Sequence, residues 1–176
     1  MTPNEKSKVL SEALPYIKKF FGKTIVIKFG GNAMIDKKLK QSFAKDVVLL
    51  KLVGMNPVVI HGGGPQINKS LNQSGKKPVF QEGIRVTDEE TMAIVVNVLD
   101  DVNKEIVKLI KENGGDANSY SNNKKLKIIK VRKLQAQEAS NDLGYVGEII
   151  DIDSSFMEHL KDNGIIPIIA PIGIGS

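Results

Sequence analysis

The chain has 176 residues, of which 41% are hydrophobic, enough for one compact domain with a sizeable core but cramped for two full domains. Its net charge of +5 could indicate a protein that binds nucleic acid. However, the lysines are scattered and only 5% of residues are aromatic, whereas grooves that bind single strands interleave basic and aromatic side chains. We therefore expect no nucleic acid partner. There is no cysteine, no run of ~18 apolar residues and no signal-peptide pattern, so disulfides, thiolate chemistry and membrane spans are excluded and a cytoplasmic protein is expected.

The first predicted element is an amphipathic helix at residues 5–21, because apolar side chains recur there at helical spacing. Pro15 removes one backbone hydrogen bond, so we expect a kink near Glu12 to Leu14 or a helix that starts later. The apolar stripe must be buried, and the pattern leaves open whether it packs on its own domain or on a neighbouring subunit. The stripe consists of Val9, Leu10, Ala13, Leu14, Ile17, Phe20 and Phe21.

Two units of strand, glycine turn and helix follow this segment. The β-branched run at 24–28 is closed by a glycine pair and leads into a helical pattern at 39–50. A second strand pattern at 57–60 ends in three successive glycines, before a short helix that ends at Gly75. This βαβα order predicts a parallel sheet covered by helices.

The pattern beyond Gly75 continues to alternate strands and helices. It first predicts a short hairpin or folded-over loop at 78–86, and then a long helix that opens with a capping box of Thr87 with Glu90 and ends at 113–115. Strands at 126–131 and 145–152 follow, around a helical turn or loop at 135–141. The last two predicted elements are a helix at 154–163 and a strand at 165–170. The last strand is an unbroken apolar run, which indicates that both of its faces are buried.

Lys28 stands near the end of the first predicted strand, directly before the turn with Gly30 and Gly31. Glycines at a strand-to-helix turn let backbone amides approach an anion, and the following helix points its positive end there. A lysine beside them supplies a mobile positive charge for a phosphate group. A tight turn with a solvated lysine remains the alternative for this motif.

His61-Gly62-Gly63-Gly64-Pro65 follows the second predicted strand. Three glycines add backbone entropy that folding must remove, so their presence favours a ligand that approaches the main chain, although a turn that needs unusual dihedral angles is the alternative. Both glycine turns would lie at the carboxyl ends of parallel strands, where ligands bind in open α/β sheets. The glycine spacings of P-loops and dinucleotide folds are absent, and for His61 a packed or hydrogen-bonded role is favoured over general base chemistry.

Three motifs stand in a specific order along the chain. They are Ile27-Lys28-Phe29-Gly30-Gly31, His61-Gly62-Gly63-Gly64-Pro65 and Gly83-Ile84-Arg85-Val86-Thr87. Together they resemble those of the acetylglutamate kinases, within the amino-acid kinase family, and the similarity runs from about Val9 to Ser176. The resemblance implies an α/β fold, a three-layer sandwich with a mainly parallel central sheet.

The resemblance also implies an activity, the ATP-dependent phosphorylation of the side-chain carboxylate of N-acetyl-L-glutamate to N-acetyl-L-glutamyl 5-phosphate in arginine biosynthesis. Mg²⁺ would be held by the nucleotide, with no protein ligand assigned. By position, Lys28 would act as the catalytic residue that stabilises charge on the transferring phosphoryl group, and Gly30 and Gly31 would offer amides to it.

The substrate would be bound by the other two motifs that carry the resemblance. Gly63 and Gly64 would contact it through the backbone, and Arg85 would bind a carboxylate with its planar guanidinium. Without the surrounding motif, Arg85 could equally form a surface ion pair. Two other functions stay open: a kinase for another carboxylate or carbamate acceptor, and a non-catalytic module that binds an anionic metabolite or assembles with a partner.

Residues 1–22 resemble the extra N-terminal segment of arginine-inhibited members of the family, which links subunits. This implies a homo-oligomer, a dimer or a hexamer of dimers, with L-arginine as feedback inhibitor, and makes residues 23–176 the substrate-binding lobe. The family continues past the position of Ser176 with a nucleotide-binding lobe, so the chain is expected to be truncated before that lobe and inactive alone. A second departure lies at 118–123, where polar residues are expected to form a turn.

Overall fold

The computed structural model describes residues 1–121, 128–134, 142–153, 155 and 163–175. In chain order its elements are α1 (Pro3–Phe20), β1 (Thr24–Phe29), the 3₁₀ helix η1 (Gly31–Met34), α2 (Lys37–Leu52), β2 (Asn56–His61), α3 (Gly64–Gln73), β3 (Phe80–Gln81), β4 (Ile84–Arg85), α4 (Glu89–Glu112), β5 (Ala117–Tyr120), β6 (Ile129–Lys133), β7 (Gly147–Ile152), β8 (Ile166–Ile169) and β9 (Ile174–Gly175). The loop predicted at 135–141 and nearly all of the helix predicted at 154–163 lie outside the described residues.

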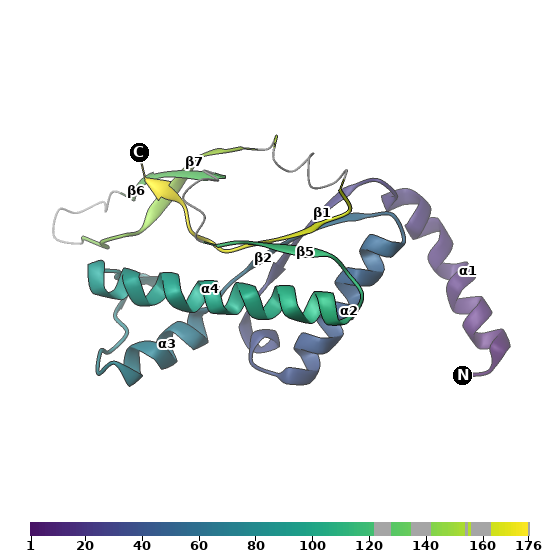
Figure 1. Ribbon diagram of the computed structural model, residues 1–176, viewed down its shortest axis with the longest axis horizontal. Coiled ribbons are helices and arrows are strands. Elements are labelled where there is room, and N and C mark those ends of the chain that lie inside the picture. The colour runs from purple at the N-terminus through teal and green to yellow at the C-terminus, as the bar shows by residue number, and fades with distance from the viewer. Residues whose placement is uncertain (122–127, 135–141, 154, 156–162, 176) are drawn as a thin grey trace.

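α1 projects to one side of the molecule, apart from the central sheet (Figure 1). Thr2 and Glu5 form a capping box at its start, in which the Thr2 amide donates to the Glu5 carboxylate at 2.7 Å. The helix runs from Pro3 to Phe20 with Pro15 inside it, so the expectation of a later start is wrong, because the capping box fixes the first turn. None of its residues is buried.

The central sheet holds four parallel strands in the order β1-β2-β8-β5. The helices α2, α3 and α4 gather on one side of it (Figure 1). Side chains alternate along β1: Ile27 and Phe29 pack into the core, whereas Val26 is 63% exposed. The predicted α/β fold with a parallel central sheet is therefore confirmed.

The main core lies between this sheet and the helices α2 and α4. Phe29 stacks on Phe43 of α2, with ring centres 3.8 Å apart and an angle of 11° between the planes. Val59 of β2 and Ile110 of α4 are completely buried. Each such side chain contributes about 1.5–3 kcal/mol by leaving water, so the strands are firmly anchored up to their ends.

Two smaller sheets lie outside the central one. β3 and β4 form the predicted hairpin, with two residues in each strand. β6 pairs antiparallel with β7 and parallel with β9, so the strands predicted at 126–131 and 145–152 are present, although β9 had no counterpart in the sequence pattern. The last predicted strand is β8, and it is buried throughout, as the apolar run indicated.

Two local predictions are wrong. The cap of α4 is Asp88, whose carboxylate accepts from the Thr91 amide at 2.8 Å, whereas Thr87 is taken up in a bridge to Gly144. The polar segment that begins at Asn118 was expected to turn, but its first part belongs to β5. Parallel pairing with the buried strand β8 overrides the weak strand preference of asparagine.

Candidate functional site

The two glycine turns lie side by side at the carboxyl edge of the central sheet. β1 and β2 are parallel neighbours, with Lys28 opposite Ile60. The Gly62 amide donates to the Phe29 carbonyl at 2.8 Å, so the pairing of the strands continues into the second turn. Because parallel neighbours are about 4.8 Å apart, the glycine pair and the glycine triplet share one rim.

Lys28 lies near this rim, on the exposed face of the sheet. Its side chain alternates with those of Ile27 and Phe29, which pack into the core, and Lys28 itself is exposed. One residue, Phe29, separates it from the glycine pair. The structure therefore brings the lysine and both glycine turns to one strand edge and leaves the ammonium group accessible to a ligand.

The glycines at the rim differ in whether their backbone or their surroundings demand glycine. Gly31 has a φ of 63°, in the left-handed region that favours glycine. A Cβ at Gly63 would lie 2.6 Å from Leu99 Cδ2, whereas Gly64 and Gly30 have open space where a Cβ would stand. No glycine of the triplet has a positive φ, but Gly63 combines φ −177° with ψ 12°, so a turn with an unusual backbone conformation stays open as an explanation.

The first turn of α3 presents unpaired backbone amides. Gly63 is the N-cap of this helix and Gly64 is its first residue. Neither amide has a backbone acceptor within the part of the chain that the structure describes. Helix N-termini combine such unpaired N–H groups with a partial positive charge, so a carboxylate or phosphate would be stabilised here.

Arg85, on β4, is held against α3. Its Nη2 donates to the side-chain oxygen of Asn68, and its guanidinium lies 4.6 Å from the ring centre of Phe80. Nη1 is buried and has no partner among the described residues. Desolvation lowers the pKa of Arg85, although a guanidinium stays charged at any physiological pH. One end of the group is thus fixed by Asn68, whereas the hydrogen-bonding capacity of Nη1 is unused among the described residues.

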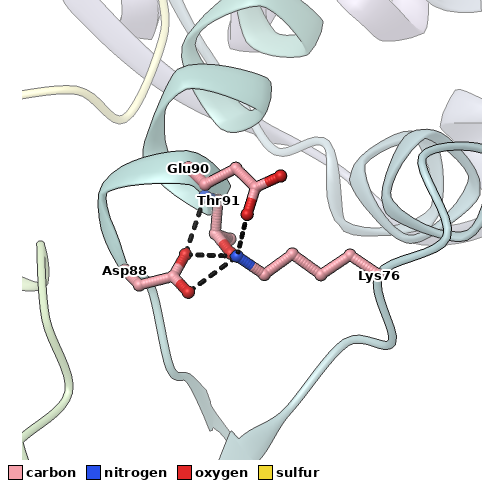
Figure 2. A network of polar contacts seen from close by, with 4 residues as sticks. All are labelled: Lys76, Asp88, Glu90 and Thr91. Carbon is pink, nitrogen blue, oxygen red and sulfur yellow. Dashed lines mark hydrogen bonds and ion pairs between the residues drawn. The ribbon is translucent and has the colours of Figure 1, made fainter.

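Ion pairs close the base of the hairpin that carries Arg85 (Figure 2). Lys76 Nζ lies 2.8 and 2.6 Å from the two carboxylate oxygens of Asp88 and 3.0 Å from Glu90 Oε2. Hydrogen bonds from Lys76 and Thr91 hold the pKa of Asp88 well below its ordinary value. Since Lys76 precedes the hairpin and Asp88 follows it, this bridge joins the two chain segments that flank Arg85.

Residues 23–176 match the amino acid kinase family. The chain belongs to this family. It is 58% identical over 180 residues to the acetylglutamate kinase of Methylobacillus flagellatus, covering 99% of this chain and 61% of that protein. It is 54% identical over 182 residues to the acetylglutamate kinase of Aromatoleum aromaticum, covering 99% and 60%. This amino acid kinase chain thus spans about 60% of the length of these curated relatives.

Solved structures agree with the family in fold. N-acetylglutamate synthase from Neisseria gonorrhoeae, complexed with coenzyme A and N-acetyl-glutamate, matches with a TM-score of 0.80 and 23% identity, covering 94% of this chain and 37% of that one. Carbamate kinase from Giardia lamblia, bound to AMP-PNP, matches with a TM-score of 0.58 and 16% identity, covering 88% and 58%. At such identities the likeness establishes the fold alone.

Some residues of the site in this amino acid kinase chain carried no sequence signal. Asn68 and Phe80 hold Arg85 but belong to none of the motifs. Asn68 could have been found only by its position, because it lies one helical turn after Gly64 and so next to the glycine triplet. Phe80 could have been found from its place opposite Arg85 in the hairpin.

A hollow lies between the start of α4 and the three-stranded sheet of β6, β7 and β9. Its volume is about 680 Å³, and its lining includes Val86, Met92, Tyr145 and Gly173 but no predicted site residue. Across the described residues, no three His, Asp or Glu side chains are gathered so that they could hold a metal ion. Nor is any helix in that part of the chain long and apolar enough to cross a bilayer.

Proposed function

We propose that this chain is the acceptor-binding part of an acetylglutamate kinase, which transfers the γ-phosphoryl group of ATP to the side-chain carboxylate of N-acetyl-L-glutamate. The observation that carries the proposal is Arg85, which Asn68 and Phe80 hold while its buried Nη1 has no partner among the described residues. A carboxylate ligand would satisfy this donor with a charge-assisted hydrogen bond. The 58% identity to the acetylglutamate kinase of Methylobacillus flagellatus supports the choice of acceptor.

Each glycine turn would bind a different group of the reactants. The amides of Gly63 and Gly64, at the positive end of α3, would hold the acceptor, while those of Gly30 and Gly31 would hold the transferring phosphoryl group. Lys28 would neutralise the charge that this group spreads over its oxygens. ATP would supply the phosphoryl group, and the nucleotide would carry Mg²⁺.

Calorimetry of this chain with N-acetyl-L-glutamate, L-glutamate and L-aspartate tests the acceptor. We expect N-acetyl-L-glutamate to bind at least about 10-fold more tightly than the other two. Arg85→Gln removes hydrogen bonds to a charged group, worth about 1.5–3 kcal/mol, so Kd should rise about 10- to 150-fold. The matched control is Arg132→Gln on β6, which loses an ion pair to Glu148 at the surface and should leave Kd unchanged. Equal Kd values for the native chain and Arg85→Gln would contradict the assignment.

Two other functions give different results in the same experiments. Tighter binding of L-glutamate or L-aspartate would favour a kinase for another carboxylate acceptor. A non-catalytic binding module is tested in the full-length protein with Lys28→Ala, for which we expect a fall in the phosphoryl transfer rate of about 100-fold or more. An unchanged rate would favour the binding module and would remove Lys28 from the site.

We also propose that α1 links copies of the chain and takes part in a response to L-arginine. No residue of α1 is buried, and its apolar stripe includes Leu10, which is 70% exposed. Such a stripe is stabilised when another surface covers it. The N-acetylglutamate synthase of Neisseria gonorrhoeae has also been solved with L-arginine.

Light scattering tests the assembly. Leu10→Glu should lower the mass of the particle in solution, whereas Lys8→Glu, on the same helix but outside the stripe, should not. In the full-length protein, L-arginine should slow phosphoryl transfer, and Leu10→Glu should weaken that inhibition. A native chain that is monomeric at all concentrations would contradict the assembly.

A further inference from the structure

His61 and Asn103 form a hydrogen-bonded pair beneath the glycine triplet. His61 ends β2 and is 1% exposed, and Asn103, in the middle of α4, is fully buried at 0%. Asn103 Nδ2 lies 2.9 Å from the Ile168 carbonyl of β8 and 3.0 Å from His61 Nε2. The pair thus connects three elements directly behind the candidate site.

The Ile168 carbonyl determines how this pair is protonated. A carbonyl accepts only, so the group of Asn103 that faces it must be the NH₂, and the same NH₂ faces His61 Nε2. Nε2 is then an acceptor, and the ring proton sits on Nδ1, which donates to the Gly62 carbonyl at 2.8 Å. Burial lowers the pKa of His61, in agreement with a neutral ring.

The imidazole therefore sets the direction of one peptide group at the rim. In a planar trans peptide the carbonyl and the N–H point in opposite directions, and the described chain has no cis peptide. Since His61 holds the Gly62 carbonyl, the Gly63 N–H of the same peptide points away from the buried ring. The Gly62 N–H is held in turn by the Phe29 carbonyl, so the peptides on both sides of Gly62 are fixed.

We infer that His61 and Asn103 are positioning residues that aim the Gly63 amide outward, toward the acceptor. Glycine has no Cβ to restrict its backbone, so Gly62 needs such external contacts if its carbonyl is to keep one direction. An apolar pair would fill the same space without burying two polar side chains, one of which, Asn103, leaves Oδ1 without a partner among the described residues. The inference rests on the proposed function only in naming the acceptor as the ligand of this amide.

Two substitutions at His61 separate positioning from plain packing. In His61→Asn the side-chain NH₂ reaches the place of Nδ1 and can still donate to the Gly62 carbonyl, whereas the longer side chain of His61→Gln reaches the place of Nε2 instead. Each variant loses one hydrogen bond from the same buried site, so a purely structural role predicts similar falls in the midpoint of thermal unfolding and similar affinities.

We expect the affinities and the amide direction to differ between the variants. In the isotopically labelled chain, the residual dipolar coupling of the Gly63 N–H should be kept in His61→Asn and changed in His61→Gln, while that of Gly31 stays constant in both. Calorimetry with N-acetyl-L-glutamate should give a Kd within about 3-fold of native for His61→Asn and raised about 10-fold or more for His61→Gln. Equal couplings in the native chain and His61→Gln would overturn the inference.

Two further outcomes are informative. If His61→Gln does not fold, Asn103→Leu replaces it, since this change keeps the ring but removes the group that orients it, and an unchanged Gly63 coupling would again overturn the inference. If the native chain does not bind N-acetyl-L-glutamate, the proposed acceptor is wrong. The residual dipolar couplings of the Gly63 N–H then decide alone whether His61 and Asn103 orient this amide.

Discussion

The glycine turns and the β3–β4 hairpin both contribute to the candidate site, but they are held in different ways. The turns end two strands whose own core-facing side chains, such as Phe29 and Val59, are almost or completely buried. The hairpin has two residues in each strand, and Val79 and Phe80 remain about half exposed. Backbone donors therefore sit on the rigid part of the molecule, and the guanidinium of Arg85 sits on a segment with little apolar burial of its own.

This difference separates two requirements of ligand binding. Main-chain amides cannot change direction without moving the strand or helix to which they belong, so they need a packed frame. A long side chain can be carried on a segment that opens at low free energy, provided that a few contacts return it to one position. Here those contacts are the ion pair of Lys76 with Asp88 and the pairing of Thr87 with Gly144. Substitutions that remove either contact test whether the hairpin depends on them for its position.

The largest effect is expected from Gly144→Ala. Gly144 has a φ of 71°, and a Cβ there would lie 2.0 Å from the Thr87 carbonyl oxygen, a backbone atom that cannot give way alone. Strain and displacement together should lower the free energy of unfolding by roughly 2–4 kcal/mol, measured by chemical denaturation. Arg85 lies two residues before Thr87, so the Kd for N-acetyl-L-glutamate should rise as well.

Gly75→Ala is the matched control for this change. Its φ of 75° is nearly the same, but a Cβ at Gly75 meets open space, so only the conformational strain of about 1–2 kcal/mol applies. The difference between the two variants isolates the contact between Gly144 and Thr87. If both variants lost equal stability, the hairpin would not depend on that contact.

The sequence predicted the ends of β1 and β2 and the hairpin, but it missed β5 of the central sheet and misplaced the cap of α4. Strands with buried alternate side chains and glycine turns leave a periodic signal, so the strand ends near Lys28 and His61 were correctly placed. The cap of α4 was assigned to Thr87 because Thr87 and Glu90 have the spacing of a capping box. Asp88 is an equally good capping residue, and only the pairing of Thr87 with Gly144 decides between them.

The contacts of Asn68 with Arg85 and of Asn103 with His61 left no signal in the local sequence pattern. Asn68 lies 17 residues before Arg85, and Asn103 lies 42 residues after His61, so neither contact has a local signature. β5 was missed for a related reason, since Asn118 and Ser119 are polar and only their pairing with β8 makes them a strand. Such contacts exist only once the sheet and helices have assembled.

The smallest effect is expected from Lys76→Gln, which removes the bridge at the base of the hairpin. The pair is exposed, so global stability should hardly change, but amide exchange in β3 and β4 should quicken and the Kd for N-acetyl-L-glutamate should rise about 2- to 3-fold. The control Lys104→Gln removes an exposed ion pair to Asp100 within α4 and should leave hairpin exchange unchanged. Equal exchange in both variants would mean that the hairpin holds its position without the bridge.

The pH dependence of this effect follows from the two shifted groups. The pKa of Asp88 is lowered in the folded chain, so its contribution is present above the unfolded value of about 3.9 and is lost as pH falls toward the folded value. The pKa of Lys76 is raised, so its contribution is present below about 10.4 and is lost as pH rises through the folded value. The free energy of hairpin opening, measured by amide exchange, should therefore differ by a constant amount between the native chain and Lys76→Gln from about pH 5 to 9. This difference should shrink below about pH 4. A difference that stays constant into strong acid would show that Lys76 acts on the hairpin by a route other than Asp88.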